Sequence, residues 1–219
     1  IDEVKKFDIK DNNKIKRINY GTNTETFNFK IKKRNNIFRI ISLRNLEEIY
    51  AINDLINAVN NLLLKNHNIQ LDIYGTGSLE KDLKKLVKNL NLDNNIKFKG
   101  KYIYEKLPSI LKKYDLYVST STSDAGLSAS TSEAMSCGII PIVSNNSENE
   151  FWMSNNSGYL YETYSYKDLA NKIMDFINLE YESKLKLFQN ARDKIIDFNS
   201  YENEMSKMLN IYKKLNESN

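Results

Sequence analysis

The residue types that could do chemistry together gather in one stretch of small and hydroxyl side chains, residues 119–144. It reads STSTSDAGLSASTSEAMSCGIIPIVS and runs from an apolar segment through a small-residue loop into a short helix that carries Glu133. Backbone N–H groups at the start of a helix can hold a phosphate. A carboxylate on the same helix can accept hydrogen bonds from paired sugar hydroxyls. The stretch therefore predicts a site for an anion and for hydroxyl groups.

Alternation of short apolar runs with amphipathic segments predicts the elements that position this site. Strands are expected at 38–42, 69–74, 95–99, 116–119, 139–144 and 158–161. Helical spacing of apolar residues predicts helices near 52–63, 79–90, 108–114, 169–177, 185–196 and 205–212. Strands that alternate with helices imply crossovers and a parallel sheet. We expect an α/β, Rossmann-like doubly wound parallel sheet of about six strands with C-terminal helices.

Three parts of the chain follow from this pattern. Residues 1–36 are rich in Asn and Lys and predict an irregular lead-in, with a short strand near 15–18 and a turn at Gly21. Residues 37–164 form the Rossmann-like domain, and residues 165–219 are helices expected to pack on it. The chain begins with Ile1 and not with Met, so we expect it to be a piece of a longer protein.

Glycines mark where a ligand would lie. In doubly wound sheets, ligands bind beyond the carboxyl ends of the strands, so the loops after residues 42, 74, 99 and 119 should converge. Gly75, Gly77, Gly100 and Gly126 fall in these loops, in a chain with 7 glycines. Glu80 stands where a dinucleotide fingerprint would have its third glycine, which disfavours a generic dinucleotide-binding domain without removing it as an alternative.

Composition excludes several classes of function. The 32 basic and 28 acidic residues are interspersed, which predicts no nucleic-acid partner; peripheral contact with an anionic membrane stays an alternative to a plain solvated surface. Cys137 is the one cysteine, so no intrachain disulfide is expected and a cytoplasmic setting fits. The sequence shows no zinc-ligand spacing, no signal-peptide pattern and no apolar run near the ~20 residues that cross a bilayer.

Residues 125–138, AGLSASTSEAMSCG, resemble the C-terminal, donor-binding domain of family-4 glycosyltransferases, which are retaining enzymes of the GT-B fold. Residues 41–55 resemble that family's strand-Gly-Arg-Leu segment, and residues 18–27 resemble its hinge motif. The resemblance covers nearly the whole chain. Its specific matches in the first segment are Gly126, Leu127, Glu133, Ala134, Met135 and Gly138.

The resemblance implies roles for individual residues. Arg44 corresponds to the arginine that grips the donor's diphosphate and is the first expected catalytic residue, because a planar fork of donors suits that task. Glu133 corresponds to the glutamate that binds the nucleotide ribose. The remaining donor-binding positions are Tyr50, Gly75, Tyr102 and Ile103, and the loop of Gly126, Leu127, Ser128 and Ala129.

Two positions depart from the family pattern. The glutamate that contacts the donor sugar falls on Ala125, although Asp124 is adjacent and a one-residue shift of the loop would bring in its carboxylate, so Asp124 is the second expected catalytic residue. The lysine that accompanies the arginine is replaced by Tyr50, whose phenol can hydrogen-bond a phosphate without a charge near pH 7.

The sequence therefore predicts the donor-binding half of a retaining glycosyltransferase that takes a UDP- or GDP-linked sugar to a glycan or lipid acceptor. It predicts no metal and no cofactor apart from this substrate. We expect the N-terminal GT-B domain to lie outside this sequence, so the fragment should bind the donor without transferring its sugar. Bacterial polysaccharide assembly is the expected setting, in the cytoplasm or at the inner face of the membrane. The alternative is a degenerate, non-catalytic domain that serves protein interaction or regulation.

Overall fold

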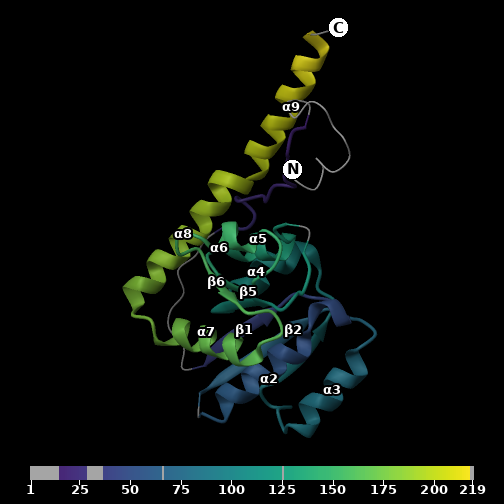
Figure 1. The fold of residues 1–219 in the computed structure, drawn as a ribbon, viewed down its shortest axis with the longest axis vertical. Helices are drawn as coiled ribbons and strands as arrows, with labels where there is room; N and C mark the ends of the chain where they lie inside the picture. The colour runs from purple at the N-terminus through teal and green to yellow at the C-terminus, as the bar shows by residue number, and fades with distance from the viewer. Residues whose placement is uncertain (1–14, 29–36, 66, 125, 218–219) are drawn as a thin grey trace.

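The computed structural model describes residues 15–28, 37–65, 67–124 and 126–217 (Figure 1). Within them, six strands form one sheet in the order β3-β2-β1-β4-β5-β6, and every neighbouring pair is parallel. The strands are β1 Phe38–Ser42, β2 Ile69–Tyr74, β3 Ile96–Gly100, β4 Leu116–Ser119, β5 Ile140–Ser144 and β6 Tyr159–Tyr161. The predicted Rossmann-like sheet is confirmed, and each strand begins and ends within one residue of its predicted position.

Helices cover both faces of the sheet, and every residue of β4 and β5 is buried between them. Ile40 packs in a core with α2 (Ile52–Leu63), α3 (Glu80–Asn89) and α7 (Tyr166–Asn178). Its neighbour Ile41 packs in a second core with α4 (Leu107–Leu111) and α5 (Ala129–Ser136). This period of two is the pleat of a strand. The helices are η2 Glu48–Tyr50, α2 Ile52–Leu63, α3 Glu80–Asn89, η3 Tyr104–Lys106, α4 Leu107–Leu111, α5 Ala129–Ser136, α6 Asn149–Met153, α7 Tyr166–Asn178, α8 Tyr181–Asn199 and α9 Tyr201–Glu217.

The lead-in differs from its prediction. Residues 15–21 form no strand, so the strand expected near 15–18 is wrong. The lead-in instead meets the body at Thr22, which makes an isolated parallel bridge with Ser200 after α8. The assigned turn lies at residues 24–26 and not at Gly21, whose φ of +76° instead allows a close approach, since a Cβ there would lie 2.6 Å from the Tyr201 Cα. Residues 15–18 read IKRI, two apolar residues around two basic ones, which lacks the period of two of a half-buried strand.

Helix α9 projects away from the sheet and its covering helices (Figure 1). Its first turns touch the body, where Glu204 is buried and accepts a hydrogen bond from the Asn19 backbone N–H at 2.7 Å. Farther along, Leu209 is 58% exposed and Tyr212 is 60% exposed. The predicted helix is therefore present, but these apolar side chains do not pack on the domain. Among the described residues, no helix is both long and apolar enough to span a membrane.

Candidate functional site

The order of the strands reverses at β1, which lies between β2 and β4, and this reversal creates a crevice at their carboxyl ends. Backbone hydrogen bonds join the predicted loops there. The Gly75 N–H donates to the Gly100 carbonyl at 2.9 Å, and the Leu46 N–H donates to the Thr76 carbonyl at 3.1 Å. The Thr120 hydroxyl donates to the Tyr50 carbonyl at 2.6 Å. The loops after β1, β2, β3 and β4 converge as the sequence predicts.

Arg44, directly beyond β1, is the centre of the first half of the site and is buried. Its Nε donates to the Ser119 hydroxyl at 2.7 Å, and its Nη2 pairs with Asp124 Oδ2 at 2.8 Å. The guanidinium carbon lies 5.5 Å from the centre of the Tyr50 ring, within reach of a cation–π interaction. The two predicted catalytic residues are thus paired with each other, and Tyr50 contacts Arg44 through its ring face. We call Arg44, Tyr50, Ser119 and Asp124 the Arg44 cluster.

Gly75 positions this cluster because it lets the loop after β2 approach the loop after β1 closely. Its φ is +136°, and a Cβ at this position would lie 2.3 Å from the Arg44 carbonyl oxygen. A side chain there would push the Arg44 loop outward. The predicted ligand-side glycine therefore has a demonstrable role in positioning Arg44.

Helix α5 begins in a way that leaves its first turn pointing into the crevice. Gly126 has φ of +88°, and Ser128 is the N-cap, whose hydroxyl accepts a hydrogen bond from the Thr131 N–H at 3.3 Å. Small residues at 129–132 let this turn lie against the lead-in, where the Thr22 hydroxyl donates to Ser132 Oγ at 2.8 Å. Such a helix start favours an anion through its free N–H groups and its dipole.

Glu133, in the second turn of α5, is the centre of the other half of the site. It is 6% exposed, and burial raises the pKa of its carboxyl to about 7. The Tyr104 hydroxyl donates to Glu133 Oε1 at 2.8 Å, which opposes that rise. Burial and this bond raise the pKa of Tyr104 to about 12. The Phe27 ring packs against the Tyr104 ring, with 5.9 Å between the ring centroids. We call Phe27, Tyr104 and Glu133 the Glu133 cluster.

Tyr102 connects the two clusters. Burial raises the pKa of its phenol, the Glu133 charge raises it further, and the Arg44 charge lowers it. The phenol therefore lies within electrostatic range of both groups. The edge of one ring faces the other where Tyr102 meets Tyr74, with 6.1 Å between the ring centroids. The neighbouring Ile103 side chain is 57% exposed.

A cavity of about 640 Å³ opens beside the Glu133 cluster, between α5 and the lead-in. Four predicted residues line it, namely Gly126, Leu127, Ala129 and Glu133. The other predicted site residues border the crevice without lining this cavity; they are Arg44, Tyr50, Gly75, Tyr102, Ile103, Asp124 and Ser128. Ala125, where the sequence departs from the family pattern, lies outside the described residues.

Arg17 and Glu148 also line this cavity, and the sequence did not reveal them. Arg17 Nη1 donates to Glu148 Oε1 at 2.6 Å, and Nη2 donates to Oε2. The two residues are separated by 131 positions. A pairing over such a separation leaves no local sequence pattern, so only the fold could have shown it.

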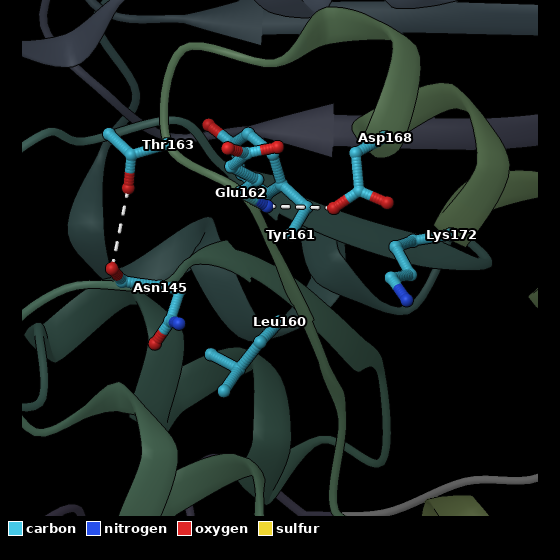
Figure 2. A pocket seen from close by; sticks show the side chains of 7 residues that line it. All are labelled: Asn145, Leu160, Tyr161, Glu162, Thr163, Asp168 and Lys172. Atoms are coloured by element: carbon cyan, nitrogen blue, oxygen red, sulfur yellow. Dashed lines mark hydrogen bonds between the residues drawn. The ribbon is translucent and has the colours of Figure 1, made fainter.

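A second hollow of about 420 Å³ lies near the end of β6 and the start of α7 (Figure 2). Asp168 there accepts a hydrogen bond from the Glu162 backbone N–H at 2.7 Å, and the Thr163 hydroxyl donates to the Asn145 carbonyl at 3.4 Å (Figure 2). None of the predicted site residues line it. The first cavity is therefore the candidate site. The described residues contain no cluster of three or more His, Cys, Asp or Glu that could hold a metal ion.

The fold defines this chain as a Rossmann-like α/β domain of the kind found in GT-B enzymes. The model of the family described as glycosyl transferases group 1 matches residues 23–194. The chain therefore belongs to this glycosyltransferase family, and the resemblance seen in the sequence is confirmed.

Individual relatives agree with this assignment. The chain is 30% identical over 167 residues to poly(ribitol-phosphate) alpha-N-acetylglucosaminyltransferase of Staphylococcus aureus, covering 73% of this chain and 32% of that protein. It is 26% identical, with a TM-score of 0.70, to an S. aureus TarM variant in complex with fondaparinux, alpha-GlcNAc-glycerol and UDP, covering 84% of this chain and 38% of that one. The C-terminal domain of the group 1 glycosyltransferase LpcC from Francisella tularensis shares the fold, with a TM-score of 0.70 and 21% identity over 81% of this chain and 98% of that one.

Proposed function

We propose that this chain is the donor-binding domain of a retaining glycosyltransferase and that its ligand is a UDP-linked sugar. The observation that carries the proposal is Glu133, a carboxylate that is 6% exposed and lines a cavity next to a helix start. Carboxylates are almost never this buried without a partner of opposite charge. Among the described residues, no cation lies within ion-pair distance of Glu133. A ligand that donates hydroxyl hydrogen bonds would compensate its burial.

The ribose, the diphosphate and the base of a nucleotide would each have a place along the site. The ribose hydroxyls would donate to Glu133, and the diphosphate would lie at the start of α5 between Leu127 and Ala129. Arg44 uses Nε and Nη2 for bonds within the domain, so Nη1 would be its donor to a phosphate oxygen. Tyr102 and Ile103 would lie against the base.

Catalysis would follow from where charge develops. When the glycosidic bond breaks, the leaving diphosphate gains negative charge, and preorganised donors lower the barrier by stabilising it. Arg44 and the N–H groups of α5 would supply this stabilisation without a metal. Chemistry would also require an acceptor bound by a second domain, so we expect this chain to bind the donor without transferring its sugar.

Names of relatives favour a uridine nucleotide and a polymer acceptor. The S. aureus relative is named for transfer of N-acetylglucosamine to poly(ribitol phosphate), and the TarM complex contains UDP. We extend both features to this chain and place it on a cell-surface polymer or glycolipid route, in the cytoplasm or at the inner face of the membrane. GDP-linked donors are the alternative that a binding experiment would separate.

Calorimetric titration of the chain with UDP, GDP, ADP and NAD tests the proposal. UDP should bind, and Glu133→Ala should weaken binding at least tenfold, because a hydrogen bond to a charged group contributes about 1.5 to 3 kcal/mol. The variant must keep the wild-type circular dichroism spectrum. Folded wild-type protein that binds none of the four nucleotides would refute the proposed function.

One observation favours a second candidate, a degenerate domain without a nucleotide ligand. Asp124 already occupies part of the Arg44 fork, and Tyr50 stands in the place of a lysine. If this ion pair cannot share Arg44 with a phosphate, the titration above will show no nucleotide binding, while the protein remains folded.

A further inference from the structure

We propose that Glu148, held by Arg17, binds the hydroxyl groups of the donor's sugar, so that the cavity contains a hexose subsite between the lead-in and the loop from β5 to α6. This inference rests on the proposed function. It adds to that function a specificity-determining residue, Glu148, which lies outside residues 119–144, the stretch that the sequence analysis singled out.

The pair faces the cavity from two segments far apart in the chain. Arg17 belongs to the lead-in, and Glu148 immediately precedes α6. The Nη1 to Oε1 distance is 2.6 Å, and the Nη2 to Oε2 contact completes a parallel fork. The side chains are 46% and 42% exposed, and Arg17 Nε also donates to Asn19 Oδ1 at 3.4 Å. Each carboxylate oxygen of Glu148 can accept a second hydrogen bond besides the one from Arg17.

Glu148 lies at the end of the cavity where a sugar would follow the diphosphate. A Cβ on Gly126 would lie 3.6 Å from Glu148 Oε2, which places this carboxylate against the loop just before α5. Glu133 lines the same cavity from the second turn of that helix. A ligand with its ribose on Glu133 and its diphosphate at the helix start would therefore extend its next group towards Glu148.

The hydrogen-bonding groups of Arg17 and Glu148 suit the hydroxyl groups of a sugar. Carboxylate oxygens accept and guanidinium N–H groups donate, so the fork matches neighbouring hydroxyls, each of which both donates and accepts. An exposed ion pair contributes little to stability, so a structural role explains its geometry poorly. Among the described residues that line the cavity, Glu133 and Glu148 are the two carboxylates and Arg17 is the one cation.

Asp124, the carboxylate that the sequence favoured for the sugar, is unsuited to the role in this structure. Its side chain is 13% exposed and engaged by Arg44, and it does not line the cavity. Releasing it would leave the buried Arg44 without its partner. Glu148 can turn to a ligand without that loss, because its own partner Arg17 lies in the same cavity.

The experiment compares the affinity of this chain for UDP with its affinity for UDP-N-acetylglucosamine and UDP-glucose. In Glu148→Ala, affinity for a UDP-sugar should fall about tenfold, the lower end of the loss expected for a charged hydrogen bond. Affinity for UDP should change less than twofold, and Glu148→Gln should give a smaller loss in the same direction. Glu150→Ala, an exposed carboxylate two positions away, is the matched control and should leave both affinities unchanged.

Each outcome decides the question. Equal weakening of UDP and UDP-sugars by Glu148→Ala would show that the pair only straps the lead-in to the domain, which overturns the hexose subsite. No change in either affinity, in a protein that loses UDP binding when Glu133 is removed, would overturn the subsite and leave the proposed function standing. Folded wild-type chain that binds no nucleotide would remove both.

Discussion

The Arg44 cluster and the Glu133 cluster share one crevice but are built in opposite ways. Arg44 is buried with a carboxylate, a hydroxyl and an aromatic ring as its partners. Glu133 is equally buried, yet its hydrogen bond within the described residues comes from the neutral Tyr104 phenol. In the Arg44 cluster the buried charge of Arg44 is neutralised by Asp124, so this cluster should stabilise the fold. The other retains an uncompensated charge, which a ligand could relieve.

This difference has opposite consequences for stability. Breaking a buried ion pair leaves a charge without a partner and destabilises the protein. Removing a buried, unpaired carboxylate eliminates an unfavourable burial and should stabilise it. The two clusters can therefore be distinguished by the sign of a single substitution in each.

Arg44→Ala should give the largest effect, a loss of about 3 to 5 kcal/mol in the free energy of unfolding, because Asp124 is left buried and unpaired. Urea denaturation followed by circular dichroism measures it. Arg17→Ala is the matched control, since it breaks the exposed pair with Glu148 and should cost no more than about 1 kcal/mol. Equal losses in the two variants would contradict the claim that the Arg44 cluster is the compensated one.

Glu133→Gln should act in the opposite direction. Burial raises the pKa of Glu133 from 4.5 to about 7, so between these values the folded state binds more protons than the unfolded state. Stability therefore falls as pH rises from 4.5 to 7, and the full cost, on the order of 3 kcal/mol, is present above pH 7. The Gln variant should be about 1 to 3 kcal/mol more stable than wild type at pH 8, and about equally stable at pH 4.5.

Urea denaturation of both proteins across this pH range gives the comparison, with Glu162→Gln as a control at an exposed carboxylate. The same substitution should weaken UDP binding, which would make Glu133 a residue kept for function at the expense of stability. A Glu133→Gln variant that is less stable than wild type at pH 8 would show that the carboxylate is compensated after all.

Sequence patterns predicted the sheet well because burial on both faces of a strand is a local property. The alternating pattern of β2 and the apolar run of β4 mark both strands to the residue. They also predicted that the loops converge, since the carboxyl ends of parallel strands lie at one edge. The strand expected at 15–18 failed because the segment IKRI lacks the period of two that marks a half-buried strand.

Pairings inside the site depend on the fold. Arg44 and Asp124 are separated by 80 positions, and Tyr104 and Glu133 by 29. The sequence identified Arg44, Asp124 and Glu133 singly, through the family pattern, but could not show that the first two neutralise each other. It also could not show that Glu133 faces a phenol instead of a cation.

Tyr104→Phe should give the smallest effect and sharpen the comparison most. The Tyr104 hydrogen bond lowers the pKa of Glu133, so its loss should raise that pKa above the wild-type value of about 7. Ribose hydroxyls donate to the ionised carboxylate, so the affinity for UDP should increase with pH as Glu133 loses its proton. In the variant this increase should occur at higher pH, and at pH 6.5 UDP should bind about fivefold more weakly, as expected for the loss of roughly 1 kcal/mol.

Well above pH 8, where Glu133 is ionised in both proteins, the two affinities should converge. Titrations with UDP between pH 6 and 9 measure this, and Tyr212→Phe, on the exposed part of α9, is the control that should follow wild type throughout. A purely structural role for Tyr104 would lower affinity equally at every pH, because it would not act through the protonation of Glu133. If the plots of UDP affinity against pH for the two proteins differ by a constant factor at every pH, the result would contradict the view that the Tyr104 hydrogen bond keeps Glu133 ionised for its ligand.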